Sequence, residues 1–397
     1  MSYYNQKRTD RYGRPQLSSR NRGNGRQPRK VYIHPSKFVR SAQMRVEAPY
    51  VPENSFADFS LHPLIQNNLV KIGFASPSPI QDKTIPAGLA GSNVVGIANT
   101  GTGKTAAFAI PVLQRLLSEA SSKAIILAPT RELAQQIEEQ CRTIAQGSGL
   151  DAALLIGGVP MGPQLRELRY APRLIVGTPG RIKDHMERRS LELAKCNIVV
   201  LDEVDRMLDM GFVNDIHDIL SHTSVDRQSF YFSATLDGRV KGIIDGFADN
   251  PVHIALKSND TSDTVEQNVI SFSSTGDKIS KLHDLLIRGT AIKTIVFDDT
   301  HRSVEKLSKE LEARGFAVGS IHGGKTQSQR QRVLKSFRNN EISVLVATDV
   351  AARGLDVPDI THVINYSVPQ TYEDYIHRIG RTGRAGKIGH ALTFVEN

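Results

Sequence analysis

Three carboxylates crowd together at the end of an apolar run in the sequence. The stretch "VVLDEVDRML" (199–208) places Asp202, Glu203 and Asp205 within four positions. Like charges 4 Å apart repel by about 4 kcal/mol at an effective dielectric constant near 20, so these side chains either face water or have a cation among them. An acidic helix start explains one carboxylate through the helix dipole but explains three poorly. The cluster therefore predicts a bound cation.

A second stretch has the order of residues expected of a phosphate-binding loop. "IANTGTGKTAAF" follows an apolar run, turns on glycines and leads into a helix-like segment, although alanine stands at the first position where the strict pattern has glycine. Glycines let successive backbone N–H groups surround phosphate oxygens, and the helix N-terminus adds a positive dipole. Lys104 is expected to reach the β- and γ-phosphates, and the Thr105 hydroxyl to bind Mg²⁺. The residues of this loop predicted to bind ATP are Thr100, Gly101, Thr102, Gly103, Lys104 and Thr105.

The two stretches together predict a site for a nucleoside triphosphate and Mg²⁺. A triphosphate and a carboxylate repel each other unless a divalent cation bridges them. Asp202 is expected to hold Mg²⁺, largely through water, and Glu203 to orient or deprotonate the attacking water. Asp205, farther along, is expected to pair with polar groups of the other half of the chain.

Short apolar runs alternate with amphipathic segments from about residue 54 onward. Runs rich in Val, Ile and Ala, each followed by a helix-like stretch, are typical of buried parallel strands in α/β units. The first series is 93–99, 124–129, 152–158, 173–179, 197–203 and 229–235, and the second is 269–274, 294–299, 316–323, 343–349, 362–368 and 391–397. Two parallel sheets flanked by helices are therefore expected, with ligands beyond the carboxyl ends of their strands.

Length and composition predict how these parts are divided. A chain of 397 residues is too long for one core and fits two domains. The polar stretch between the two series is expected to be a hinge. The predicted parts are a disordered basic tail at 1–45, an ATP-binding domain at 46–256, a hinge at 257–263 and a second domain at 264–397.

The positive charge of the chain lies in its tail. Residues 1–45 hold 12 Lys or Arg against one acidic residue, which leaves 38 basic against 40 acidic residues in the rest. The tail has few aliphatic residues and cannot bury enough apolar surface to fold alone. It is either a solubilising leader or a nonspecific tether for a polyanion, and the second interpretation is favoured.

Two negative observations point to the cytoplasm. Cys141 and Cys196 are the only cysteines and lack the spacing of a disulfide framework or a metal site, so both are interpreted as core or neutral residues. No apolar run approaches the roughly 18 to 20 residues that span a bilayer, and the polar N-terminus does not resemble a signal peptide. We expect a cytoplasmic protein without a membrane segment.

The ordered motifs of residues 54–397 resemble the DEAD-box family of superfamily 2 RNA helicases. They are "GFASPSPIQ", "ANTGTGKT", "PTREL", "GG", "TPGR", "DEVD", "SAT", "IVFDDT", "QSQR", "ATDVAARGLD" and "HRIGRTGR". Any one of them could occur by chance, but eleven in the order of the family could not. The resemblance implies two tandem RecA-like domains.

The resemblance also implies roles at the nucleotide. Gln81 is expected to read the adenine edge and Phe56 to cover the ring, unless Phe56 is a plain core residue. Asp356 is expected to contact the ribose, and Arg381 and Arg384 to neutralise charge on the γ-phosphate, where such an arginine can supply about 10³ to 10⁵ in rate. The residues expected to couple the acid cluster to the second half are Asp205, Ser233, Thr235 and His377.

For RNA, the resemblance implies contacts to phosphates and 2′-hydroxyls with little base specificity. The implied residues are Thr130, Arg131, Gly157, Gly158, Thr178, Gly180 and Arg181 in the first half, and Gln327, Arg330, Thr348 and Gly354 in the second. Two features depart from the family pattern. Val204 stands where the family has alanine, and the chain ends at Asn397, where the last predicted strand ends.

The prediction is an ATP-dependent RNA helicase that separates short duplexes or remodels RNA–protein complexes locally. ATP and single-stranded RNA would each favour the closed arrangement of the two halves, so each would tighten binding of the other. Two alternatives stay open at this point. One is a translocating DNA helicase of the wider superfamily, and the other is an RNA clamp whose ATP site only gates binding.

Overall fold

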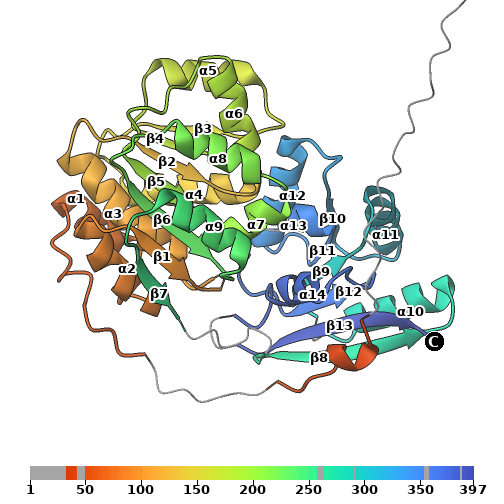
Figure 1. Ribbon diagram of the computed structural model, residues 1–397. Coiled ribbons are helices and arrows are strands. Elements are labelled where there is room, and N and C mark those ends of the chain that lie inside the picture. The colour runs from red at the N-terminus through yellow and green to blue at the C-terminus, as the bar shows by residue number, and fades with distance from the viewer. Residues whose placement is uncertain are drawn as a thin grey trace, which may run out of the picture. The chain divides into compact units, whose positions relative to one another are not determined.

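The computed structural model describes residues 33–42, 50–99, 101–256, 263–289, 291–352, 357–384 and 387–397. These residues form two parallel sheets with helices packed on their faces (Figure 1), which confirms the predicted fold of tandem RecA-like domains. Within these ranges, no helix combines the length and the apolar character that crossing a membrane requires. The predicted hinge, apart from Asp263, lies outside the described residues.

The first sheet has seven strands in the order β3-β4-β2-β5-β6-β1-β7, and all its pairs are parallel. Its strands are β1 (Val94–Ile97), β2 (Ala124–Leu127), β3 (Ala152–Leu155), β4 (Leu174–Gly177), β5 (Ile198–Leu201), β6 (Gln228–Ser233) and β7 (Val252–Ala255). Its helices are α1 (Pro63–Lys71), α2 (Pro79–Leu89), α3 (Lys104–Ser118), α4 (Arg131–Ile144), α5 (Met161–Arg169), α6 (Pro179–Glu187), α7 (Val204–Asp209), α8 (Val213–Ser221) and α9 (Gly238–Phe247).

The second sheet has six parallel strands in the order β10-β11-β9-β12-β13-β8. Its strands are β8 (Val265–Phe272), β9 (Thr294–Phe297), β10 (Val318–Ile321), β11 (Val344–Ala347), β12 (His362–Asn365) and β13 (Gly389–Glu396). Its helices are α10 (Thr275–Ile287), α11 (His301–Ala313), α12 (Gln327–Arg338), α13 (Asp349–Ala352) and α14 (Tyr372–Ile379). A short 3₁₀ turn, η1 (Pro35–Phe38), lies beside β8 and β13 (Figure 1).

The inner strands are continuous apolar runs because both of their faces are covered. In β5 all four residues are buried; Val200 belongs to one hydrophobic cluster, whereas Val199 and Leu201 belong to the cluster on the opposite face. Successive side chains of a strand point to opposite faces, so a strand between two helix layers needs apolar residues at every position. The Val- and Ile-rich runs of the sequence follow from this requirement.

The order of the strands in each sheet determines which of the loops that follow them are neighbours. Because parallel strands end at the same edge of a sheet, the loops after neighbouring strands lie together. The ends of β5, β6 and β1 are neighbours on one side of the first sheet, and the ends of β3, β4 and β2 are neighbours on the other side. In the second sheet, β10 and β11 are neighbours.

Two features differ from the sequence-based expectations. Each of the twelve predicted apolar runs overlaps a strand, but β7 was not predicted; it pairs with β1 and buries only Ile254. The predicted disordered tail also extended to residue 45, whereas Ile33–Ala42 pack on the second sheet and Phe38 is fully buried. The excess of basic residues led to the prediction of disorder, although this region also contains a few large apolar residues.

Close packing at Gly96 predicts that the first sheet will not tolerate a side chain there. A Cβ atom on Gly96 in β1 would lie 2.6 Å from Cδ1 of Phe232 in β6, so Gly96→Ala would force the ring or the strand to move. Such overpacking costs about 1 to 3 kcal/mol, and we expect a clearly lower midpoint of thermal unfolding. Gly242→Ala in α9 is the control, because a Cβ there meets no atom within 4 Å and alanine favours helix. An equal effect of the two substitutions would contradict the packing argument.

Candidate functional site

The glycine-rich loop joins β1 to α3 in a tight turn. Gly101 and Gly103 have φ of 83° and 93°, in the left-handed region that glycine adopts without strain. Lys104, the first residue of α3, is 6% exposed, and its Nζ donates a hydrogen bond to the carbonyl oxygen of Ala98 at 3.0 Å. The Lys104 side chain is thus folded back over the loop, with its ammonium held at the end of β1.

Gln81 braces this loop from α2. Its Nε2 donates to the carbonyl oxygen of Gly103 at 3.1 Å, and its Oε1 accepts from the backbone N–H of Ser78 at 3.0 Å. The Ser78 hydroxyl donates to the carbonyl oxygen of Thr102 at 2.8 Å. A Cβ on Gly103 would lie 2.5 Å from Nε2 of Gln81, so this contact requires glycine. Gln81, the residue predicted to read adenine, therefore fixes the loop that is predicted to bind phosphate.

Asp202 lies at the end of β5 with 2% of its surface exposed. Burial raises the pKa of its carboxyl group to about 6, and the nearby Lys104 opposes that shift only in part. One carboxylate oxygen accepts a hydrogen bond from the backbone N–H of Glu203 at 3.0 Å. A positive charge placed beside a buried carboxyl group with a raised pKa would stabilise its ionised form.

Glu203 has a cationic partner. Its backbone is left-handed, with φ 53° and ψ 55°, which is uncommon for a residue other than glycine and is a form of strain that collects at functional sites. Nη1 of Arg206 donates to its Oε2 at 2.9 Å, and both side chains are buried. Burial by itself would raise the pKa of Glu203, but Arg206, Lys104 and Arg381 together outweigh it and lower the pKa. Glu203 is therefore held ionised.

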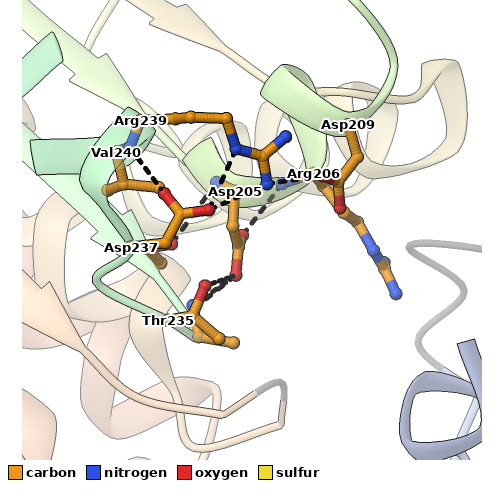
Figure 2. A network of polar contacts seen from close by, with 9 residues as sticks. Asp205, Arg206, Asp209, Thr235, Asp237, Arg239 and Val240 are labelled. Carbon is orange, nitrogen blue, oxygen red and sulfur yellow. Dashed lines mark hydrogen bonds and ion pairs between the residues drawn. The ribbon is translucent and has the colours of Figure 1, made fainter. Parts of the chain in front are cut away.

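Asp205 binds within its own half of the chain. Its Oδ2 accepts hydrogen bonds from the backbone N–H groups of Ala234 and Thr235 at 3.0 and 3.1 Å, and from the Thr235 hydroxyl at 3.3 Å. Its own N–H donates to the Ser233 hydroxyl at 3.3 Å. Figure 2 shows the carboxylate pointing to Thr235. These contacts lie within the first half of the chain, because β5 and β6 are neighbours and the loops that follow them meet. The expected pairing of Asp205 with polar groups of the other half stays a prediction.

Arg239 holds the next part of the same network. It bridges Asp237, at the start of α9, and Asp209, at the end of α7, at 2.8 and 2.9 Å (Figure 2). Asp237 caps α9 by accepting from the backbone N–H groups of Arg239 and Val240. The helix that follows the acid cluster is therefore tied at both ends to the segment that follows β6.

A cavity of about 560 Å³ opens beside the loop and the acids. Residues from helices and loops of both halves of the chain line it. Those that bear on nucleotide chemistry are Gly101, Gly103, Lys104, Thr105, Asp202, Glu203, Arg381 and Arg384. A Cβ built on Gly101 would be at van der Waals distance from Arg384, 3.6 Å from its Cδ. A second cavity of about 240 Å³ adjoins it and is lined by His377 together with Asp205, Thr235 and Arg381.

The helix α14 leads to the two cavity-lining arginines and is anchored by Arg378. Nε and Nη2 of Arg378 donate to the two carboxylate oxygens of Asp349 at 2.6 and 2.7 Å, and Nη1 donates to the carbonyl oxygen of Ser367 at 2.7 Å. Arg378 is 2% exposed, and such a two-pronged pair fixes direction as well as distance. Arg381 and Arg384 follow in the turn after α14, and Nε of Arg384 donates to the carbonyl oxygen of Gly380 at 2.9 Å.

The RNA-binding residues predicted in the first half follow β2, β3 and β4. The Thr130 hydroxyl caps α4 by accepting from the N–H of Leu133 at 3.2 Å. The Arg131 side chain lies against Gly157 and Gly158, where a Cβ on Gly158 would be 2.5 Å from its Cζ. Thr178 is the N-cap residue of α6, which includes Gly180 and Arg181, and Nη1 of Arg181 donates to the carbonyl oxygen of Val159 at 3.2 Å.

Two of the predicted RNA-binding residues of the second half, Gln327 and Arg330, contact helix α4 of the first half. Nη2 of Arg330 lies 2.8 Å from Oε2 of Glu132 in α4. Nε2 of Gln327 donates to Oε1 of Glu132 and to Oε1 of Gln135, both at 3.2 Å. Thr348 follows β11 and is 6% exposed. Three predicted site residues, Thr100, Gly354 and Asp356, lie outside the described residues.

Some residues of the site were not predicted from the sequence. Phe74 lines the main cavity, whereas Phe56 is 6% exposed and packs edge-on against Phe59 and Phe74, with ring centroids 5.9 and 5.5 Å apart. Arg206 was also missed, although its place three residues after Glu203 in a helix was a usable signal. The contact of Arg330 with Glu132 had no signal in the sequence.

Family comparisons agree with this geometry. Residues 78–243 match the family described as DEAD/DEAH box helicase, and residues 277–386 match the helicase conserved C-terminal domain. The chain is 45% identical over 343 residues to the DEAD-box ATP-dependent RNA helicase CshA of Bacillus licheniformis, which covers 86% of this chain and 70% of the relative. It is 44% identical to CshA of Bacillus subtilis, over 86% of this chain and 69% of the relative.

Solved structures give the same result. The chain is similar to S. cerevisiae Dbp5 bound to RNA and ADP BeF3, with a TM-score of 0.76 and 32% identity over 86% of this chain and 90% of that one. It is also similar to Mss116p bound to ssRNA and AMP-PNP, with a TM-score of 0.78 and 29% identity over 87% and 77% of the two chains. With the loop, the acids and the arginines on one cavity, this chain belongs to the DEAD-box family of ATP-dependent RNA helicases.

Proposed function

We propose that this protein hydrolyses ATP in the cavity between Lys104, Glu203 and Arg381, and uses the cycle to separate short RNA duplexes or remodel RNA–protein complexes locally. The observation that carries the proposal is that a loop and acids from the first sheet share one cavity with two arginines from the second. A nucleotide bound there would contact both sheets. Binding and hydrolysis would then change how the two sheets hold RNA.

The residues present suit Mg²⁺ together with the triphosphate. Asp202 is a buried carboxyl group whose pKa is raised by burial, and Thr105 lines the same cavity; carboxylate and hydroxyl oxygens are ligands that Mg²⁺ accepts. No group of three or more His, Cys, Asp or Glu among the described residues forms a metal site. Mg²⁺ commonly takes one or two carboxylates and completes its shell with phosphate oxygens and water. When bound, it neutralises charge on the phosphates.

Glu203 is the group that would orient and deprotonate the attacking water. Its lowered pKa keeps it ionised and able to accept a proton, and Arg206 fixes the carboxylate direction. Arg381 and Arg384 would neutralise charge on the γ-phosphate as the bond to it breaks. Val204 is fully buried in an apolar cluster. We therefore propose that valine at this position leaves the arrangement of the three acids and the rate of ATP hydrolysis unchanged.

RNA would lie across the loops that follow β3, β4 and β2 and those that follow β10 and β11. In this region, Thr130, Arg131, Thr178 and Arg181 offer hydroxyl and guanidinium groups, which suit phosphate and 2′-OH contacts without base readout. The loops proposed to bind the nucleotide follow β5, β6 and β1 and lie at the same edge of the first sheet. We also propose that the basic residues preceding Ile33 act as a nonspecific tether for RNA, with salt-sensitive affinity.

The choice of nucleic acid tests this function against both alternatives. We expect single-stranded RNA to stimulate ATP hydrolysis well above the level reached with DNA of the same sequence, and a short RNA duplex to be separated only when ATP is present. Phosphate release and a fluorescent duplex assay measure the two quantities. Stronger stimulation by DNA would support a DNA translocase. Binding of RNA that depends on ATP but proceeds without repeated turnover would support a clamp.

Replacing the proposed base separates hydrolysis from binding. Glu203→Gln keeps the shape of the side chain but cannot accept the proton, so we expect RNA-stimulated turnover to fall by about 10² to 10⁴. ATP-dependent RNA binding, measured by fluorescence anisotropy with a slowly hydrolysed ATP analogue, should persist. Asp209→Asn is the control, because Asp209 lies at the other end of α7, is paired with Arg239 and does not line the cavity. Turnover of Glu203→Gln equal to that of the control would remove Glu203 from this role.

The second-sheet arginines should act mainly on the rate. Arg384→Ala removes a guanidinium that lines the cavity, and we expect kcat to fall by about 10³ or more, with a much smaller change in ATP affinity. Lys387→Ala is the matched control, since Lys387 is an exposed cation in the same turn and pairs with Asp359. Steady-state kinetics at saturating RNA give kcat and KM. A loss confined to KM would mean that Arg384 binds ATP without stabilising the transition state.

A further inference from the structure

The segment Ile33–Ala42 precedes the first sheet in the sequence but packs on the second. Phe38 is fully buried, and its ring centroid lies 4.7 Å from that of Tyr375. Together with Ile33 it completes an apolar cluster whose other buried members are Val265, Tyr375, Ile379 and Ala391. Burying a phenylalanine contributes about 1.5 to 3 kcal/mol, so this contact is a substantial one for so short a segment.

Polar contacts fix the same segment to the edge of the sheet. The N–H of Arg40 donates to the carbonyl oxygen of Gln267 at 3.0 Å, and the N–H of Gln267 donates to the carbonyl oxygen of Arg40 at 2.8 Å. This antiparallel bridge falls on β8, which is the edge strand. The Arg40 guanidinium pairs with Asp263. The segment therefore has one defined register on β8.

The docking surface is one face of the helix that leads to the arginines. Tyr372, Tyr375 and Ile379 lie three and four positions apart in α14 and so share a face. Lys37 Nζ lies 5.5 Å from the ring centroid of Tyr372, while Tyr375 and Ile379 belong to the cluster around Phe38. From the same helix and the turn after it, His377 and Arg381 line the cavities with the acid cluster.

The chain is anchored again a few residues later, on the helix that braces the phosphate loop. The carboxylate of Asp82 in α2 accepts from the Tyr50 hydroxyl at 2.5 Å, from the Glu53 N–H at 2.7 Å, and from the N–H and Nδ2 of Asn54 at 3.1 and 2.8 Å. Burial would raise the pKa of Asp82, but these hydrogen bonds outweigh it and lower the pKa. The neighbouring residue, Gln81, holds the carbonyl oxygen of Gly103.

We propose that Ile33–Ala42 is a positioning segment for the two arginines that follow α14, Arg381 and Arg384. We also propose that the chain after it, which is hydrogen-bonded to Asp82, tethers the segment to the nucleotide side of the first sheet. The proposal rests on the proposed function, because it assumes that Arg381 and Arg384 act on ATP. The segment acts through Tyr375 and Ile379 and does not touch substrate. Ala42 and Tyr50 are eight residues apart and thus at most about 29 Å apart along the chain. The tether therefore keeps the segment within that distance of the anchor at Asp82.

The alternative is that the segment only covers an edge strand, which proteins commonly do to prevent aggregation. The two possibilities differ in kinetics. A cover would affect stability and solubility alone. A positioning segment would affect kcat at saturating ATP and RNA with little change in KM for ATP, since a misplaced arginine costs most in the transition state.

The test uses the full chain with substitutions on the two faces of the segment. Phe38→Ala removes the buried ring, and we expect kcat at saturating ATP and RNA to fall about tenfold, within the roughly 100-fold that an ångström of misplacement can cost. Phe38→Leu refills much of the site and should restore most of the rate. Val39→Ala is the matched control, because Val39 is the next residue and is 53% exposed. Equal kcat for Phe38→Ala and Val39→Ala would overturn the proposal.

A truncation pair gives an independent readout. Deletions of residues 1–32 and of residues 1–42 both remove the basic tail, and only the second also removes the docking segment. We expect a lower kcat only in the second, with recovery when a peptide of residues 31–43 is added at millimolar concentration, the range that a short tether supplies. The same peptide carrying Phe38→Ala should not restore the rate. Equal kcat for the two deletions, or recovery with both peptides, would contradict the proposal.

Loss of folding and failure of the proposed function are recognised separately. Circular dichroism and the midpoint of thermal unfolding report whether each variant is folded; if the longer deletion does not fold, Phe38→Ala and its Phe38→Leu rescue decide the question. Absence of RNA-stimulated ATP hydrolysis in the unaltered protein would refute the proposed function. Normal stimulation in the unaltered protein with unchanged kcat in the folded variants would refute only the positioning role.

Discussion

The structure depends on keeping three carboxylates buried within four residues of the end of β5. Each is stabilised by a different neighbour. Asp202 has Lys104 close by, Glu203 is paired with Arg206, and Asp205 accepts hydrogen bonds from the segment after β6. An unpaired buried charge is costly, so the positions of the phosphate loop and of β6 are both constrained by this one cluster. Asp202, the least compensated of the three, is where positive charge from outside the chain would stabilise the site most.

The sorting of loops along one sheet edge explains how two ligands can use one domain without overlap. The loops after β5, β6 and β1 carry the acids and the phosphate loop, and those after β3, β4 and β2 carry the residues proposed for RNA. The helix α4 takes part both in the proposed RNA site and in the contact with the second sheet. Its first residues include Arg131, which lies against Gly158, and Glu132, which pairs with Arg330 of the second sheet.

The sequence was most informative where one local rule decides the structure. Apolar runs buried on both faces locate the inner strands, and the loop, acids and arginines could be placed at strand ends. It was least informative where a long-range contact decides the partner of a residue. Phe74 rather than Phe56 lines the cavity, and Phe38 is buried although it lies in a basic region. In each case the residue type was visible, but its neighbours depend on packing between segments far apart in the chain.

Contacts between the sheets also bear on how ATP and RNA would influence each other. Arg330 is buried and its charge is met by Glu132; moving the sheets apart would expose or unpair both groups. A nucleotide held by Lys104 and Arg381 would favour the same contact, and so would RNA held by Arg131, next to Glu132 in α4. Two ligands that stabilise one arrangement must each tighten the binding of the other. The size of this coupling is limited by the difference in affinity that each ligand has for the two arrangements. The Glu132–Arg330 pair contributes to the free-energy difference between these arrangements, which binding of either ligand would shift.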